Sequence, residues 1–395
     1  MGLPLRVIPY PSRRGRPPCL PWRRATTGGC PYPFNCRKKR FSRKTVRSQT
    51  SISQNATPKR SNKRRVFSGI QPSGDVQLGN YLGAMKGWAA RQAEKENFFC
   101  IVDLHALTVP QKPDELHNQT RSLAAMLLAI GIDPHLSTLF IQSHVAAHAE
   151  VCWILNCMTP IGWLERMTQY KDKSSSQESV VTGLLDYPVL MAGDILLYDT
   201  DEVPVGDDQR QHVELARDIA QRFNHLYGET FVVPEPFIAE VGARIMGFND
   251  PALKMSKSYS HIRGHAVRLL DEPEEIERTI KRAVTDSGNE IRFSNDPERA
   301  GVNNLLVIYK VVTGKEATAV EADFADAGGY GELKSRVAEV VIDELSPIRA
   351  RYAELMADVT ELDRLLACGA ERAAAVSEPK AEEIKRKVGL VLPVS

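Results

Sequence analysis

The order of hydrophobic and polar positions predicts alternating strands and helices over a long central stretch of the chain. Short apolar runs at 66–70, 98–102 and 139–141 are typical of strands that are buried on both faces of a sheet. Between these runs, apolar residues at helical spacing predict helices over about 80–96 and 114–130. Strands that alternate with helices through short connections form parallel sheets with crossover helices, so we expect a Rossmann-like α/β fold.

The next part of the chain predicts an insertion and then more elements of the same fold. Helical and polar segments over about 146–183 are expected to form a helical insertion between two halves of the sheet. Periodicity then predicts helices over 184–198 and 209–226, with the extended segment 202–205 between them. These elements would complete a Rossmann-type domain over residues 65–250.

The character of the sequence changes after this domain. Residues 251–265 predict a polar loop, and residues 266–395 predict an α-helical C-terminal domain. The last 65 or so residues are expected to form a small helical bundle. Within them, Ser346 and Pro347 indicate a kink or the start of a new helix.

Charge separates the N-terminal 65 residues from the rest of the chain. They contain 18 Lys and Arg and no acidic residue, whereas the remainder carries 33 basic and 49 acidic residues, a net charge of −16. An Arg- and Ser-rich segment without acids is typical of a mitochondrial or chloroplast transit peptide, which we predict for residues 1–64. The alternative is a disordered arm that binds nucleic acid through the basic clusters 37–40 and 63–65.

Two classes of protein are disfavoured by the remaining composition. No run of 18 apolar residues occurs, so we expect no membrane-spanning helix and no membrane partner. The seven cysteines include no C-x-x-C pair and match no zinc or iron–sulfur spacing, which indicates free thiols in a reducing compartment and no metal bound by cysteine.

The first candidate for chemistry is the lysine-rich stretch 254–258, Lys-Met-Ser-Lys-Ser. It follows Asn249-Asp250-Pro251, and the proline and small polar residues predict a loop. Lys254 and Lys257 could contact the oxygens of a transferring phosphoryl group, with the hydroxyls as hydrogen-bond donors. By itself, however, the pattern is more typical of a solvated polar loop.

A second candidate lies where the first predicted strand meets the first predicted helix. Gly79 and Asn80 open that helix, and helix N-termini attract phosphate because their N–H groups are unpaired. Gly79 would also let an adenine or ribose approach the main chain closely. Taken alone, however, these residues are more typical of a tight turn before a helix.

The apolar helix predicted over 184–198 places one carboxylate, Asp194, on a face with apolar neighbours. Tyr187, Met191 and Asp194 are spaced i, i+4 and i+7, so they share one face. A buried carboxylate needs a hydrogen-bond donor, and an indole N–H donates without accepting. Asp194 is therefore a candidate for selecting a tryptophan side chain, with a surface or capping carboxylate as the alternative.

Polar residues at 206–209 form a further candidate site. Asp207 and Asp208 could hydrogen-bond ribose hydroxyls, and Gln209 could hold the polar ends of an amino acid; alternatively, the two acids only favour the helix dipole. His105 and His212 are expected to be structural or to shape a substrate pocket, because phosphoryl-level chemistry needs charge stabilisation more than proton transfer.

These stretches together resemble the HIGH and KMSKS signatures of class I aminoacyl-tRNA synthetases. Across residues 65 to the C-terminus the chain is similar to tryptophanyl-tRNA synthetases of the bacterial or organellar type. The matching segments, in order, are Ser68–Gly74, the Asp194 helix, Gly206–Gln209, Gly242–Met246, the lysine-rich stretch and Ala283–Ser287.

The resemblance implies a tryptophan–tRNA ligase that attaches L-tryptophan to tRNA(Trp) through a tryptophanyl adenylate. It implies magnesium with ATP, a homodimer, an anticodon-reading C-terminal domain and work in organellar protein synthesis. The implied catalytic residues are Lys254, Lys257 and Gln71. The implied ATP-binding residues are Gln71, Pro72, Ser73, Gly79, Asn80, Gly206, Asp207, Asp208, Ile245, Lys254, Met255, Ser256, Lys257 and Ser258. The implied tryptophan-binding residues are Asp194, Phe67, Val102, His105, Gln169, Tyr187, Met191, Val203 and Gln209.

The chain departs from the family pattern at two places. Gln77 stands where the family usually carries Thr or His, and the stretch Tyr259–His265 replaces the Asp-Pro-Asn that normally follows the lysine-rich stretch. Two other functions stay open on the sequence: a tyrosyl-tRNA synthetase, which shares the architecture, and a non-catalytic RNA-binding protein on a synthetase scaffold. Contacts with tRNA would come from local basic clusters such as Arg278, Lys281 and Arg282, or 385–387.

Overall fold

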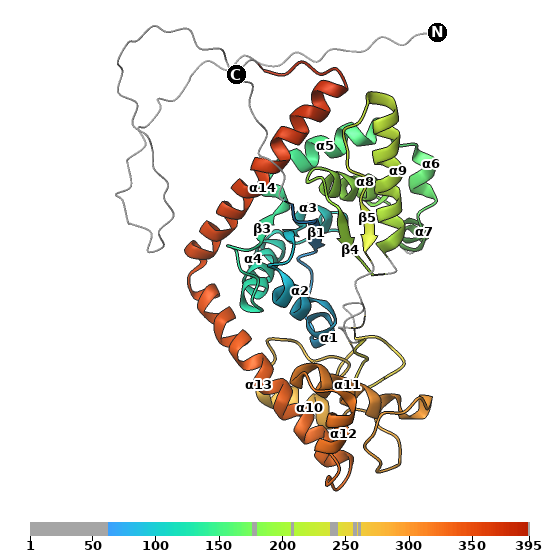
Figure 1. The fold of residues 1–395 in the computed structure, drawn as a ribbon, viewed down its shortest axis with the longest axis vertical. Coiled ribbons are helices and arrows are strands. Elements are labelled where there is room, and N and C mark those ends of the chain that lie inside the picture. Colours follow the sequence, from blue (N-terminus) through green and yellow to red (C-terminus); the bar gives the residue numbers. More distant parts are fainter. Residues whose placement is uncertain are drawn as a thin grey trace, which may run out of the picture. The chain divides into compact units, whose positions relative to one another are not determined.

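A five-stranded parallel sheet forms the centre of the fold, with the strand order β3–β2–β1–β4–β5 (Figure 1). The computed structural model describes residues 62–175, 180–206, 209–237, 244–255, 259 and 262–393. The strands are β1 (Arg65–Ile70), β2 (Glu96–Ile101), β3 (Thr138–Ile141), β4 (Glu202–Pro204) and β5 (Glu235–Phe237). The predicted Rossmann-like α/β fold is confirmed. The predicted transit peptide lies almost wholly outside the described residues.

The order of the strands reverses at β1. The chain runs outward from β1 to β2 and β3, and then returns to place β4 on the other side of β1, where Val66 pairs with Glu202. In open α/β sheets, ligands bind beyond the carboxyl ends of the strands at such a reversal. The fold thus points to the space beyond Ile70 and Pro204 as the place for a ligand.

Both faces of the sheet are covered, which explains the continuous apolar runs. Successive side chains of a strand point to opposite faces, and in β2 Phe98 and Cys100 enter one hydrophobic core while Phe99 and Ile101 enter the other. Helices α5 (Ala147–Asn156), α8 (Thr182–Leu196) and α9 (Arg210–Tyr227) contribute to the first of these cores. Helix α4 (Pro113–Ala129) contributes to the second.

The connection between β1 and β2 differs from the single helix predicted over 80–96. It consists of α1 (Leu78–Asn80), a π-helical turn η1 (Tyr81–Met85) and α2 (Lys86–Arg91). The helix ends early because the Gln92 side chain donates to the main-chain oxygens of Ala89 and Gly131, at 2.9 and 2.8 Å. This contact with the turn after α4 cannot be read from local periodicity.

The segment after β3 is helical, as the pattern predicted. It contains η2 (Gln142–His144), α5, α6 (Ile161–Glu165) and α7 (Thr168–Ser175) before the chain enters α8. Helices α5 and α8 approach closely at Gly193, where an added Cβ would lie 3.5 Å from the main-chain nitrogen of Cys152. The short helix α3 (Asp103–Ala106) follows β2 directly.

The C-terminal region is helical, which confirms that part of the prediction. Its elements are α10 (Pro273–Lys281), η5 (Pro297–Arg299), α11 (Ala300–Thr313), α12 (Ala317–Asp323), α13 (Tyr330–Ala357) and α14 (Val359–Lys387). Pro347 lies inside α13, so the predicted restart at this proline is wrong. Among the described residues, none of the helices has the length and apolar character needed to cross a bilayer.

The predicted small bundle in the last 65 residues is wrong in one respect, because α14 packs against the edge of the sheet. An added Cβ on Gly369 would lie 1.8 Å from the main-chain oxygen of Leu139 in β3. The Arg372 guanidinium donates to the main-chain oxygen of Ser137 and, at 2.7 Å, to the hydroxyl of Thr138. Small residues let the helix approach the strand, and the contact covers an edge that would otherwise expose unpaired main-chain groups.

Candidate active site

A cavity of about 340 Å³ lies beyond the carboxyl ends of β1 and β4, where the strand order reverses. All nine residues predicted to bind tryptophan line it, together with Gln71 and Gly206 from the predicted ATP set. The complete lining consists of Phe67, Gly69, Gln71, Val102, His105, Gln169, Tyr187, Met191, Asp194, Ile195, Val203, Pro204, Val205, Gly206 and Gln209. Gly69, Ile195, Pro204 and Val205 were not predicted to bind a ligand. The last three adjoin predicted residues in the sequence, and Gly69 lies two residues from Phe67 and Gln71.

Asp194 of α8 is held by three neighbouring side chains. Its Oδ1 accepts a hydrogen bond from Gln142 Nε2 at 2.7 Å and lies 2.7 Å from His148 Nδ1. Its Oδ2 lies 2.8 Å from His105 Nε2. Burial alone would raise the pKa of Asp194, but the hydrogen bonds and charge of His105 and His148 hold that pKa well below its usual range. The carboxylate is therefore ionised at neutral pH although it is 1% exposed.

The two carboxylate oxygens of Asp194 face different surroundings. Gln142 and His148, the partners of Oδ1, are fully buried and do not line the cavity, whereas His105, the partner of Oδ2, does. Each carboxylate oxygen can accept two hydrogen bonds. Oδ1 has two partners and Oδ2 has one within the described part of the chain, so Oδ2 can accept another donor on the cavity side.

A buried network behind Asp194 was missed by the sequence analysis. His148 Nε2 lies 2.9 Å from the hydroxyl of Tyr198, whose pKa is raised by burial. The ring of Tyr198 stacks on Phe67 at a centroid distance of 5.5 Å and lies 4.7 Å from Phe98. Because β1, β2, α5 and the segment after α8 bring these residues together from separate parts of the chain, no local pattern indicates them.

Tyr187 closes another wall of the cavity. Its hydroxyl donates to Gln169 Oε1 at 3.1 Å and lies 2.9 Å from Nε2 of His212, which is fully buried. Burial raises the pKa of Tyr187 to about 12. His105 also contacts the edge of the Tyr187 ring, at a centroid distance of 6.3 Å. His212 thus lies at the hydroxyl of a neutral Tyr187, and His105 lies against its ring.

The space over Gly79 holds a neighbour that the sequence did not predict. An added Cβ on Gly79 would lie 2.7 Å from the main-chain oxygen of Met255, and the Gly79 N–H points at the Met255 sulfur at 3.3 Å. Gly79 therefore admits the main chain of Met255 in this structure, and its contact with a nucleotide stays a prediction.

The start of the lysine-rich stretch is one arm of a small hairpin. Gly247 N donates to Leu253 O at 2.8 Å, and Met255 N donates to Ile245 O at 3.0 Å. Ile245 and Met255 belong to the hydrophobic core, with exposures of 1% and 0%. Their side chains anchor the hairpin, and their contact with ATP stays a prediction, whereas the side chain of Lys254 is exposed.

The remaining residues of the predicted ATP set are placed as follows. Gln71 and Ser73 are exposed in the loop after β1, Pro72 is buried there, and Asn80 ends α1. Asp207, Asp208, Ser256, Lys257 and Ser258 lie outside the described residues.

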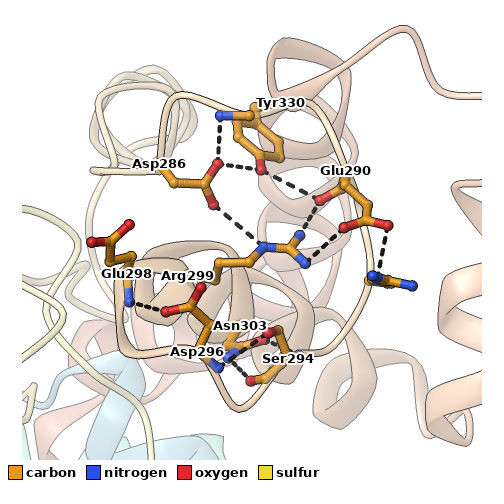
Figure 2. A network of polar contacts seen from close by, with 10 residues as sticks. Asp286, Glu290, Ser294, Asp296, Glu298, Arg299, Asn303 and Tyr330 are labelled. Atoms are coloured by element: carbon orange, nitrogen blue, oxygen red, sulfur yellow. Dashed lines mark hydrogen bonds and ion pairs between the residues drawn. The ribbon is translucent and has the colours of Figure 1, made fainter.

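A second polar cluster, shown in Figure 2, involves the predicted segment Ala283–Ser287. Arg299 lies between Asp286 Oδ2, at 3.5 Å from Nε, and Glu290 Oε2, at 3.3 Å from NH1. The Tyr330 hydroxyl donates to Asp286 Oδ1 at 2.6 Å, and this bond contributes most to lowering the pKa of Asp286. The cluster joins the loop before η5 to the start of α13, which gives this segment a structural role.

Comparison with known proteins agrees with this geometry. The family described as tRNA synthetases class I (W and Y) matches residues 59–346. The tryptophan–tRNA ligase of Caldanaerobacter subterraneus subsp. tengcongensis is 54% identical over 83% of this chain and 99% of its own length.

Solved structures extend the similarity. The tryptophanyl-tRNA synthetase of Campylobacter jejuni, complexed with ADP and tryptophan, aligns with a TM-score of 0.74 and 38% identity over 82% of this chain and all of that one. The tyrosyl-tRNA synthetase of Archaeoglobus fulgidus shares the fold, at a TM-score of 0.57 and 22% identity over 74% of this chain and 90% of that one. The predicted resemblance is confirmed: the chain belongs to the tryptophan–tRNA ligases, a family of class I aminoacyl-tRNA synthetases.

Proposed function

We propose that this chain activates L-tryptophan with ATP and transfers it to tRNA(Trp). In the first step the tryptophan carboxylate attacks the α-phosphorus, the bond from that phosphorus to the bridging oxygen breaks, and pyrophosphate leaves. In the second step a hydroxyl of the 3′-terminal ribose attacks the carbonyl carbon of the adenylate, and AMP leaves. The observation that carries this proposal is an ionised, buried carboxylate with one open acceptor position on a cavity at the strand reversal.

The open position of Asp194 Oδ2 suits an indole nitrogen. An indole N–H donates one hydrogen bond and accepts none, which matches a single remaining acceptor. The hydroxyl of a tyrosine ligand would both donate and accept a hydrogen bond. The Tyr187 hydroxyl in the cavity wall is already bonded to Gln169 and His212, so it is engaged elsewhere. A ligand without a donor would leave the buried charge short of a partner, which is costly.

Adenylate formation needs alignment and charge stabilisation more than a proton-transfer residue. The side chain of Lys254 is exposed on the hairpin. The residue that follows it, Met255, packs on Gly79 at the start of α1, the first helix after β1. We propose that the ammonium of Lys254 contacts phosphate oxygens as pyrophosphate leaves, with Lys257 and Gln71 in the same role. Pro72, Ser73, Asn80, Gly206 and the main chain of 254–258 would contact other parts of ATP, and Asp207 and Asp208 its ribose.

Magnesium would enter as part of the substrate. Within the described residues no group of three potential metal ligands is found. Mg²⁺ commonly binds through substrate phosphates and its own waters, with one or two carboxylates. We therefore propose magnesium–ATP as the substrate, with the charge of Lys254 adding to that of the ion.

Binding of tRNA(Trp) is proposed for the C-terminal helices. In α10 Arg278 pairs with Glu275, and Lys281 pairs with Glu277 at 2.5 Å. At the end of α14, Lys385 pairs with Glu150 at 3.1 Å. The two α10 pairs are exposed and contribute little, so their cations can exchange a carboxylate for a phosphate. Beside the partly buried Lys385, Arg386 and Lys387 are the exposed cations of α14.

A homodimer is proposed from a group of exposed apolar side chains. Trp153 of α5, Ile161 of α6, and Val180 and Val181 before α8 are 70%, 62%, 40% and 51% exposed. Helices α5 and α6 both contact α8, so these side chains come from one packed group of elements. Exposed aromatic and aliphatic side chains that gather in this way mark interaction surfaces, and a second copy of the chain is the occupant we propose.

Function in a mitochondrion or chloroplast is proposed from the leader. Residues 1–65 contain 18 basic residues and no acidic residue, whereas the remainder of the chain is acidic. A cleaved transit peptide accounts for this contrast, because transit peptides are rich in Arg and Ser and poor in acidic residues.

Pyrophosphate exchange tests the reaction. We expect ATP–pyrophosphate exchange that depends on tryptophan and magnesium and that tyrosine does not support. Replacing Lys254 with Ala should lower the exchange rate by about 10²–10³-fold, because one charge at the leaving group is lost. Tryptophan affinity should stay the same. The matched control is Lys112→Ala, an exposed lysine on another surface. A wild-type chain without exchange would identify a non-catalytic scaffold.

Asp194→Asn tests the choice of amino acid. Exchange should be measured with tryptophan and with an analogue that carries sulfur in place of the ring nitrogen. The wild type should prefer tryptophan strongly, and the variant should lose about 10²-fold or more in kcat/KM for tryptophan while the difference between the two ligands shrinks. The KM for ATP should not change. An undiminished preference in the variant would mean that Asp194 does not contact the indole nitrogen.

Sedimentation velocity tests the dimer. At micromolar concentration the wild type should sediment as a dimer, and Trp153→Glu should sediment as a monomer because it places a charge in the apolar contact. Leu226→Glu, at an exposed residue of α9, is the control and should remain dimeric. A dimeric Trp153→Glu variant would place the interface elsewhere.

A reporter fusion tests the destination. Residues 1–65 fused to a fluorescent protein should be imported into mitochondria or chloroplasts and shortened on import. Changing Arg13, Arg14 and Arg16 to Glu should abolish import, because transit peptides lack acidic residues. Accumulation of the unmodified fusion in the nucleus would instead favour the nucleic-acid-binding arm.

A further inference from the structure

His265 ends the stretch in which this chain departs from the family pattern, and its side chain is fully buried. It lies beside the hairpin that carries Lys254. Its main-chain oxygen accepts from Phe248 N at 2.9 Å, and its own N–H donates to Ile262 O at 3.2 Å. The residue therefore joins the segment after the lysine-rich stretch to the hairpin before it.

The imidazole contacts both arms of the hairpin. Nδ1 lies 2.8 Å from the Asn249 side-chain oxygen, and Nε2 lies 3.3 Å from the main-chain oxygen of Lys254. A main-chain oxygen only accepts hydrogen bonds, so Nε2 must be the donor to Lys254. With Nε2 protonated, a half rotation of the Asn249 amide lets its N–H₂ group donate to Nδ1. One ring thereby fixes a turn residue and the carbonyl of the lysine.

Gly247 provides the slot for this ring. An added Cβ on Gly247 would lie 2.1 Å from Cε1 and 2.4 Å from Nδ1 of His265. The absence of a side chain is thus required by the ring and not by the main-chain conformation. The Tyr259 ring lies on the imidazole as well, at a centroid distance of 5.6 Å.

Lys254 is consequently anchored on both sides. Met255, the next residue, is buried against Gly79 and bonded to Ile245. The carbonyl of Lys254 itself is held by His265. The side chain of Lys254, by contrast, is exposed. Fixing the main chain on both sides sets the position from which the ammonium group leaves it.

We propose that His265 is a positioning residue that holds the main chain of Lys254 for adenylate formation, with Gly247 as its required slot. The proposal rests on the proposed function, in which Lys254 contacts phosphate oxygens. A misplacement of about 1 Å in such a group can cost about 10²-fold in rate. His265 does not touch a substrate, and its effect on the reaction passes through Lys254.

A double-mutant cycle in the full-length chain tests the pair. His265→Ala and Gly247→Ala should each lower the exchange rate by about 10–100-fold and raise the KM for ATP, while the KM for tryptophan stays unchanged. In the double variant, the added methyl group no longer meets a ring, so Gly247→Ala should cost little in the His265→Ala background. His225→Ala, an exposed histidine of α9, is the control and should behave as wild type.

A conservative pair keeps the test decisive if His265→Ala does not fold. The amide of Gln reaches about as far as Nε2, and the amide of Asn does not, so His265→Gln should retain more exchange than His265→Asn. Equal loss in these two variants, additive losses in the cycle, or an equal rise of both KM values would overturn the proposal. If the wild type lacks exchange, the proposed function itself has failed; full activity of His265→Ala in an active wild-type background refutes only the positioning role.

Discussion

An ionised carboxylate in a dry interior is the constraint on which the site depends. Asp194 is 1% exposed, and a bare charge there would be too costly to keep. His105, His148 and Gln142 supply the donors that make the ionised form stable, and they come from three different elements. The surrounding fold therefore has to hold α5, α8 and the ends of β2 and β3 at fixed distances, since the loss of one donor would expose the charge to an apolar environment.

The parallel sheet provides that rigidity. Its strand order reverses at β1, so that the carboxyl ends of β1 and β4 leave a crevice which α8 closes from one side. Behind Asp194, Tyr198 links His148 to the aromatic side chains of β1 and β2. The core and the cavity thus share the same side chains, and a change in core packing would change the shape of the cavity.

The lysine-rich hairpin is organised differently. The side chain of Lys254 is exposed, whereas the position of the hairpin depends on buried side chains: Met255 against Gly79, and His265 in the slot at Gly247. The unusual stretch Tyr259–His265 therefore supplies a contact of its own to the hairpin. An exposed side chain on a buried support combines access from solvent with a defined starting position, which the proposed role of Lys254 requires.

Sequence alone determined the class of fold, because apolar runs and helical spacing depend on local burial and are repeated along β1, β2, β3 and α4. It also indicated Asp194, since a carboxylate on the apolar face shared with Tyr187 and Met191 needs a partner. Only the tertiary structure decided which groups are its partners: His105, Gln142 and His148 are distant from Asp194 in the sequence, and their hydrogen bonds to it leave no periodic trace. The same holds for the end of α2 at Arg91, for α14 on the edge of β3, and for Met255 over Gly79, because each is set by a contact between segments far apart in the chain.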